Sequence, residues 1–410
     1  MQDLIPYDLV TTKLNDWYRA IKAENVDLAI EIKQQVKREL DSMEENQDAL
    51  LYFSLLEFRH SLLESHLNAK NPHDLDKTYL TLKKVERQEN LTGMLEYYYY
   101  FFMGMYEFRR KELTTAISAY RKAEMMISEI NDEIEQAEFY FKVSYVYYYM
   151  KQTYFSLNYA NRALNIYERY DDYLVQALRC RFVIGGNLID ESKFRQALHM
   201  FLEIVDIAEK NKLAHIKGMA HINAAICYEE LKQYNDVCEH LDLALNYLET
   251  HHNSFVTKAL FNQTHVYLKR GMFLEAKYYY IKGLKYVDEF NDEEYKLKFM
   301  ILTGLYYEDD HSLILEAFDS LLKKNMYADV ENLALEVAEY FSSNENFKLA
   351  NDYFRMSIDV RKKLERRSLL MKKILVTSIM LISLVAFSQI VEHNVDKAEN
   401  VYQVADRVAA

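Results

Sequence analysis

The chain has 410 residues and a formal net charge of −13, with only 8 glycines and 2 prolines. Because glycine and proline interrupt helices and build tight turns, a chain this poor in both is predicted to be all-α. The shortage of glycine also excludes the glycine-rich phosphate loops of nucleotide-binding folds. The acidic balance argues against nucleic-acid binding, which normally requires a basic face.

Neither the cysteines nor the first residues indicate that the main part of the chain is secreted. Cys180, Cys227 and Cys238 show no metal-binding or redox spacing and are typical of reduced thiols in the cytosol. The first ten residues contain no basic side chain, whereas a secretory signal begins with a basic stretch. We therefore expect a cytoplasmic body without a metal cluster or cofactor of its own.

The N-terminal part has apolar residues at the i, i+3, i+4 spacing of amphipathic helices. Three such stretches occur, at Tyr7–Glu24, Asn25–Met43 and Gln47–Leu67. The polar segment Asn68–Lys77 follows and contains Pro72, which indicates a linker. The expected arrangement is a three-helix bundle over residues 1–67, a linker, and a second helical domain.

From about residue 95 a helical unit recurs, and small residues lie seven positions apart in most copies. The pairs are Ala116/Ala123, Ser156/Ala163, Ala197/Ile204, Val237/Ala244, Ala276/Gly283 and Ala350/Ser357, with a weaker unit around Ala317. Their first members are 33 to 41 residues apart, a period of helical solenoids. The K/R-x-x-F/Y turn before each small residue resembles tetratricopeptide repeats, so residues 78–370 are predicted to form a curved array with a peptide-sized channel.

The aromatic residues have two interpretations. The chain contains 35 tyrosines and 21 phenylalanines, and runs such as Tyr97–Phe102 lie inside helical patterns. Packing between stacked helices is the expected role of most of them. Some tyrosines can instead line the channel, where a ring and a hydroxyl suit a bound peptide.

The last forty residues have a different character. A basic stretch, Met371–Lys373, precedes eighteen residues without charge, Ile374–Val391, and the small-residue site Ala386–Ser388. These are the parts of a bacterial secretory signal, here placed behind the helical body. They suggest a receptor joined to the precursor of a small secreted peptide. The run is also near the minimum length for a membrane-spanning helix, and a buried last helix is a further alternative.

Several segments of the body resemble the Rap proteins of Bacillus, a peptide-sensing tetratricopeptide family. They are Lys13–Tyr18, Met43–Tyr52, Leu56–His60, Leu91–Tyr98, Gly104–Phe108 and Gly186–Asn187, and the resemblance extends over about residues 5 to 365. The tail is similar to a Phr precursor, whose last five or six residues commonly form the signal peptide with a basic residue second. The last five residues fit that form: Asp406, Arg407, Val408, Ala409 and Ala410.

The Rap resemblance implies two activities that both use the N-terminal bundle. Some Rap proteins speed hydrolysis of the aspartyl phosphate of a response-regulator receiver, and others bind a regulator's DNA-binding domain without chemistry. Gln47 matches the glutamine that aligns the attacking water, and the receiver would supply its own aspartate and divalent metal. Residues that match docking positions are Glu44, Glu45 and Phe58. Asn46 stands where many relatives have Asp, which leaves sequestration open.

The same resemblance assigns the peptide site to the array. Asn187, Asp190 and Asn223 match positions that hold the Phr backbone and its basic side chain. Amide groups can clamp an extended backbone, and Asp190 can pair with Arg407. The plain alternative for each is a helix-cap or turn residue.

The leading hypothesis is therefore a quorum-sensing phosphatase of the sporulation phosphorelay, inhibited by a Phr-type peptide that is supplied in trans or by its own tail. The alternative is a non-enzymatic protein that sequesters a transcription factor or activates a mobile genetic element. The tail adds three hypotheses: a tethered inhibitor, a membrane anchor through 374–391, and an internal start at Met371 that yields free precursor. A tail exchanged between chains would link them into homo-oligomers.

Overall fold

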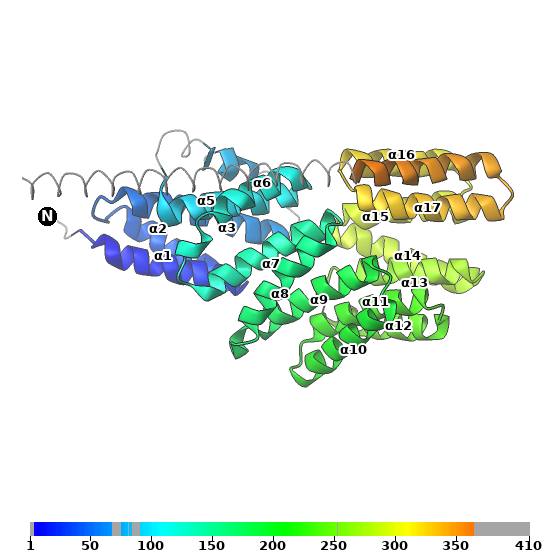
Figure 1. The fold of residues 1–410 in the computed structure, drawn as a ribbon, viewed down its shortest axis with the longest axis horizontal. Helices are drawn as coiled ribbons and strands as arrows, with labels where there is room; N and C mark the ends of the chain where they lie inside the picture. Colours follow the sequence, from blue (N-terminus) through cyan, green and yellow to red (C-terminus); the bar gives the residue numbers. More distant parts are fainter. Residues whose placement is uncertain (1–3, 68–74, 81, 84–90, 252, 365–410) are drawn as a thin grey trace, which may run out of the picture. The chain divides into compact units, whose positions relative to one another are not determined.

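The computed structural model describes residues 4–67, 75–80, 82–83, 91–251 and 253–364, which form helices joined by short turns (Figure 1). Within these described ranges there is no β-strand, and an isolated backbone bridge pairs Ile5 with Met43. The predicted all-α class is confirmed.

The predicted three-helix bundle is confirmed. It consists of α1 (Tyr7–Lys22), α2 (Val26–Leu40) and α3 (Gln47–Leu67), which pack on one another. Asn25 begins α2 by accepting a hydrogen bond from the Leu28 N–H at 3.2 Å, because the first N–H groups of a helix lack partners within it. At the centre, the buried Trp17 Nε1 donates to His60 Nδ1 at 2.9 Å, so the indole is fully satisfied.

Helix hairpins follow the bundle, as the repeat pattern predicted (Figure 1). Their helices are α5 (Gly93–Arg109), α6 (Leu113–Glu124), α7 (Glu133–Tyr149), α8 (Thr153–Tyr167), α9 (Leu174–Asp190), α10 (Phe194–Lys210), α11 (Ala214–Glu230), α12 (Tyr234–Thr250), α13 (Val256–Lys269), α14 (Phe273–Phe290), α15 (Glu293–Leu302), α16 (His311–Lys323) and α17 (Tyr327–Ser343). Short 3₁₀ turns lie at Ile127–Glu129 and Asp171–Tyr173, and a π turn lies at Thr303–Tyr307.

In the five hairpins from α5 to α14, the turn between the two helices uses one left-handed residue. These residues are Lys111, Lys151, Ser192, Lys232 and Gly271, with φ between 55° and 71°. They recur every 39 to 41 residues, the same interval as the small residues. Only the last is glycine, so the other four turns hold a side chain in a conformation that favours glycine.

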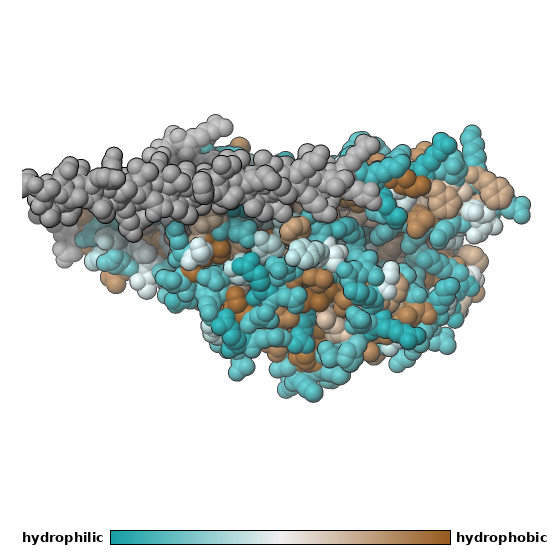
Figure 2. Space-filling model, in the orientation of Figure 1, coloured by the Kyte–Doolittle hydropathy of each residue, from teal (hydrophilic) through white to brown (hydrophobic). Residues whose placement is uncertain are grey.

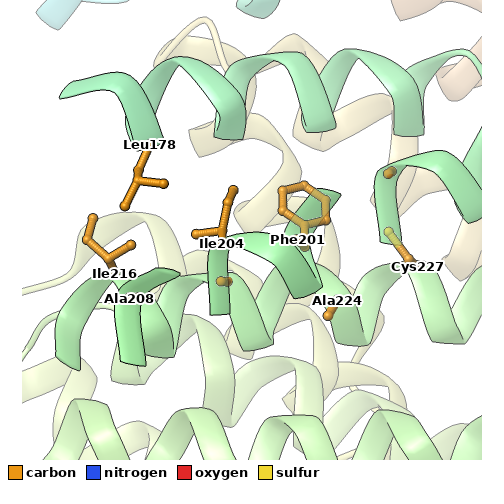
Figure 3. Close-up of a cluster of buried hydrophobic side chains, with 9 residues drawn as sticks. Leu178, Phe201, Ile204, Ala208, Ile216, Ala224 and Cys227 are labelled. Atoms are coloured by element: carbon orange, nitrogen blue, oxygen red, sulfur yellow. The ribbon is translucent and has the colours of Figure 1, made fainter. Parts of the chain in front are cut away.

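Helices within a hairpin approach closely where an aromatic ring lies over a glycine. A Cβ added to Gly104 would lie 2.3 Å from Tyr120 Cε1, and one added to Gly185 would lie 2.5 Å from Phe201 Cζ. Phe201 also belongs to the apolar cluster in Figure 3, to which α10 contributes Ile204 and α11 contributes Cys227. The small residues of the predicted pairs are buried as well, and Ala116, Ala123 and Ala197 are each 0% exposed.

The chain divides into two compact units, residues 1–330 and 331–410. The second is described only to residue 364. In it, a helix over 347–364 packs along α17: the Ser357 hydroxyl donates to the Glu331 carbonyl at 2.9 Å, and the Tyr353 and Phe341 rings stack. The predicted domain boundaries at 67, 77 and 370 fall at or near residues outside the described ranges and stay predictions.

Over the part of the chain that the structure describes, no helix is both long and apolar enough to cross a membrane. The apolar run 374–391 and the pentapeptide 406–410 lie outside the described residues. On the face shown in Figure 2, hydrophilic side chains cover much of the surface and hydrophobic patches interrupt them.

Candidate functional site

Gln47 occupies the first position of α3, at the surface of the bundle. The turn before it is held by the N-terminal segment, because the Ile5 N–H donates to the Ser42 carbonyl at 2.7 Å and the Glu44 N–H donates to the Ile5 carbonyl at 2.9 Å. Backbone hydrogen bonds on both sides of this turn give the start of α3 a defined position. Gln47 is thus presented from a rigid element.

Asn46 has a structural role at the same place. Its Oδ1 accepts from the Ala49 N–H at 2.9 Å, which caps the start of α3. A cap requires only an acceptor oxygen, which aspartate supplies equally well. Asn46 therefore caps α3 as well as the aspartate that the Rap resemblance implies at this position would.

The predicted docking residues are separated by the fold. Glu44 and Glu45 are exposed beside Gln47 and place two negative charges next to it. Phe58 is only 1% exposed and packs against the Tyr106 ring, with ring centroids 5.7 Å apart. Of the three docking residues, the structure thus brings Glu44 and Glu45 to one surface with Gln47, whereas Phe58 lies in the core between α3 and α5.

A pocket of about 540 Å³ opens beside the start of α3. It is lined by Tyr7, Thr11 and Asn15 of α1, by Asn46, Asp48, Ala49, Leu51 and Tyr52 around the start of α3, and by Leu91, Thr92, Met94, Leu95 and Tyr98 at the start of α5. Its floor is ordered, because the Tyr52 hydroxyl donates to Asn15 Oδ1 at 3.1 Å and the Tyr52 and Tyr98 rings stack at 5.6 Å. No sequence pattern predicted this pocket, since its walls come from three separate helices.

The predicted peptide-binding residues lie on the first helices of two consecutive hairpins. Asn187 is 1% exposed, and its amide nitrogen donates to the Ser156 hydroxyl and the Val183 carbonyl, both at 2.8 Å. Asn223, on α11, is half-buried and donates to the Met219 carbonyl at 2.8 Å. In both cases the amide nitrogen is engaged within the array, and the buried Asn187 Oδ1 has no hydrogen-bond partner among the described residues.

Asp190, at the end of α9, is part of an ion pair. Its carboxylate lies 2.6 Å from Lys151 Nζ, in the turn between α7 and α8. The Tyr148 ring packs against Gly186, one turn earlier on α9. Burial, followed by the negative charge of Asp190, raises the pKa of Tyr148, so its hydroxyl stays a protonated hydrogen-bond donor beside the carboxylate. Sequence reasoning selected Asp190 but neither of these two neighbours.

Comparison with known proteins decides the family. The family model "response regulator aspartate phosphatase H, N terminal" matches residues 4–65. Over 366 residues the chain is 53% identical to response regulator aspartate phosphatase I of Bacillus subtilis (strain 168), with 89% of this chain and 94% of that protein covered. This chain belongs to the Rap family. The resemblance inferred from the sequence is confirmed for the body, and the Phr-like tail stays a prediction.

Two solved Rap structures differ in how well they match. The apo form of RapI is 52% identical, covers 87% of this chain and 99% of its own, and superposes with a TM-score of 0.65. A Rap protein complexed with competence and sporulation factor is 38% identical, covers 88% of this chain and 100% of its own, and reaches a TM-score of 0.79. The relative with less sequence in common is thus the more similar in backbone arrangement.

Proposed function

We propose that this Rap protein removes the phosphoryl group from the aspartyl phosphate of a response regulator in the sporulation phosphorelay, and that a Phr-type peptide inhibits it. The observation that carries the proposal is the placement of Gln47: it is exposed at the start of a capped helix, with Glu44 and Glu45 beside it. The identity of 53% to a protein named as a response regulator aspartate phosphatase supports the same activity.

The role proposed for Gln47 is to position the attacking water against the phosphoryl group. Its amide oxygen accepts a hydrogen bond from the attacking water, and its nitrogen donates to a phosphoryl oxygen. Water attacks phosphorus, the bond from phosphorus to the aspartyl oxygen breaks, and the products are the free carboxylate and inorganic phosphate. The receiver contributes the aspartate and a divalent metal, so this chain needs no cofactor of its own.

The peptide site is proposed on α9 and α11. Asp190 would pair with the arginine of the peptide, and the oxygens of Asn187 and Asn223 would accept from its backbone. The solved Rap protein that contains competence and sporulation factor supports a peptide ligand for the family. Arg407 of the chain's own last five residues offers the matching cation.

We further propose that the tail acts as a tethered inhibitor. The 35 residues from Met371 to Ala405 would hold the pentapeptide at an effective concentration on the order of millimolar if they span the distance to the array. A peptide that is exported and re-imported, or supplied by another chain, is the alternative source.

The test is phosphate release from a phosphorylated sporulation response regulator. The full chain is compared with a truncation that ends at Leu370, and each is assayed with and without synthetic Asp-Arg-Val-Ala-Ala. Greater activity of the truncation, suppressed again by the peptide, is the expected result. Equal activity of both forms would refute the tethered inhibitor and leave the phosphatase proposal standing.

Gln47→Ala separates hydrolysis from sequestration. The expected loss of phosphate release is at least about a hundredfold, because a positioning group is removed from the transition state, whereas binding of the regulator should change little. Gln34→Ala, an exposed glutamine of α2, is the matched control. If neither the wild-type truncation nor the variant releases phosphate and both bind a regulator's DNA-binding domain, the protein is a sequestering regulator.

A further inference from the structure

The last described helix, over 347–364, has two different apolar faces. One face packs on α17, and its Tyr353 is only 2% exposed. The other face is left in water, although its residues lie at the i, i+7, i+11 spacing that aligns side chains along one side of a helix. We call this face the end stripe; it consists of Phe347, Phe354 and Ile358, which are 66%, 36% and 50% exposed.

The middle of the end stripe is a position that earlier hairpins bury. In each second helix from α6 to α12, the side chain four positions after the first small residue of the repeat is at most 2% exposed; these residues are Tyr120, Ala160, Phe201 and Leu241. Phe201 belongs to a cluster to which α11, the first helix of the next hairpin, contributes Ile216 (Figure 3). Phe354 stands four positions after Ala350, and among the residues that the structure describes no further helix follows it.

An exposed apolar face is unusual at the end of a repeat array. Solenoids end in a helix with a polar outer face, because no further repeat covers it. Single apolar side chains at a surface are ordinary, whereas a contiguous group of large ones indicates a surface that another segment or molecule covers. The end stripe therefore indicates a further layer that packs on the helix over 347–364.

The chain has an apolar segment close to this helix in sequence. Ile374–Val391 carries no charge, and 13 of its 18 residues are apolar. As a helix it would measure about 27 Å, the length of the 18-residue helix over 347–364. Nine residues, Glu365–Lys373, connect the two, whereas three, Asn211–Leu213, suffice between α10 and α11. So short a connection gives the segment an effective concentration on the order of millimolar at its own end stripe, which favours it over a second copy of the chain.

We propose that the end stripe is the seat of Ile374–Val391, which packs on Phe354 and Ile358 and closes the array. The stripe and the segment both belong to the second compact unit, residues 331–410. A seated segment is withheld from a lipid bilayer, so the pentapeptide behind it stays in the same compartment as the array. The seat itself rests neither on Gln47 nor on the proposed peptide site.

Hydrogen exchange of the full chain, followed by mass spectrometry, tests whether Ile374–Val391 is covered. Phe354→Glu and Ile358→Glu are combined in one stripe variant, which places two charges on the seat. The matched control is Leu274→Glu combined with Ile281→Glu, because these side chains are 85% and 58% exposed and lie seven positions apart on α14. Circular dichroism and the exchange of α17 establish that each variant keeps its helices.

The amides of Ile374–Val391 are expected to exchange at least about tenfold faster in the stripe variant than in wild type, because loss of the cover raises the open population. The α14 control should match wild type. Ile358→Glu alone should give a smaller change in the same direction, and it decides the question if the double variant loses protection in α17. Equal exchange in wild type and in both stripe variants overturns the proposal, and so does an equal acceleration in the control.

Two further measurements distinguish the other occupants of the stripe. Light scattering gives the mass of the particle, and protection that is seen only in a dimer and lost on dilution would assign the seat to a second copy and overturn the proposal. In flotation with phosphatidylethanolamine–phosphatidylglycerol vesicles, wild type should stay unbound and the stripe variant should float. Equal flotation of both would assign the segment to the membrane and overturn the seat as well.

Phosphate release from the same samples separates this proposal from the proposed function. If Ile374–Val391 is protected in wild type and released in the stripe variant, the seat stands even when no form releases phosphate from a response regulator. That combined result would count against the phosphatase proposal alone. Phosphate release together with equal exchange in all forms would overturn the seat and leave the phosphatase proposal standing.

Discussion

Lys151 and Asp190 form a 2.6 Å ion pair that joins the turn after α7 to the last turn of α9. Their side chains are 36% and 17% exposed, so the pair lies in a partly desolvated place where a competing cation can still reach the carboxylate. Lys151 therefore binds the Asp190 carboxylate that we assign to the arginine of a peptide. It competes with that arginine for Asp190.

The first prediction concerns this competition. Lys151→Gln should tighten binding of labelled Asp-Arg-Val-Ala-Ala by about threefold, and Asp190→Asn should weaken it at least about tenfold, as expected for a charged hydrogen bond lost. Fluorescence anisotropy measures both, and Lys269→Gln, which removes another lysine from an ion pair of the array, is the control. A shift in the same direction for the two variants would contradict the assignment.

The left-handed turns give a second prediction. Lys232 has φ of 60° and an exposed side chain, so a Cβ brings strain without compensating packing. Lys232→Gly should raise the free energy of unfolding by ~0.5 kcal/mol, the net of relieved strain and added chain entropy. Lys285→Gly, at an exposed position inside α14, should lower it by about 1 kcal/mol. Urea denaturation distinguishes the two, and equal effects would show that the turn is unstrained.

The third prediction follows from the close contact between Gly104 and Tyr120. In Gly104→Ala the new methyl group would lie 2.3 Å from Tyr120 Cε1, so the ring or the helix must move. Overpacking of this kind costs about 1–3 kcal/mol, which should appear as a lower melting temperature. Combining the change with Tyr120→Leu should cost less than the sum of the two single changes, because the smaller side chain removes the clash. Strict additivity would place the strain elsewhere.

The fourth prediction is a pH dependence of stability. Burial, then His240 and Lys217, lowers the pKa of His221 to about 4, whereas Glu209 acts in the opposite direction. The unfolded chain binds this proton near pH 6.5 and the folded chain only near pH 4, so stability should fall as the pH drops through that window. The loss is at most about 3 kcal/mol.

His221→Phe is the variant that checks this linkage. The His221 ring stacks on Tyr247 with an interplanar angle of 1°, an arrangement that phenylalanine can keep. Urea unfolding at pH 7 and pH 5 should show a smaller difference for the variant than for wild type. An identical difference would assign the acid sensitivity to other groups.

The repeat could be read from the sequence because it is a local property. A small residue such as Ala197 or Ala276 recurs at a fixed interval, and the helix between two turns needs only its own residues to form. The start of α3 was likewise predictable, since Asn46 caps a helix whose hydrogen bonds lie within four residues. Gln47 could thus be placed at a helix start, although its partner surface could not.

The rest depended on packing between distant segments. Phe58 matched a docking pattern, yet the fold buries it against Tyr106, because the apolar face of α3 meets α5 rather than water. No pattern in the sequence distinguished Glu135 from the many surface glutamates. It is buried because other helices deliver its partners, among them the Tyr18 hydroxyl, 117 positions away, which donates to it at 2.8 Å.

The sequence by itself therefore determined the helices, their period and the family, since these follow from side-chain spacing within a few turns. Only the tertiary structure decided which charges are buried together, because the burial of a carboxylate depends on partners that other helices deliver. The pocket beside Gln47, the Lys151–Asp190 pair and the buried Arg59–Glu138 pair all belong to this second kind.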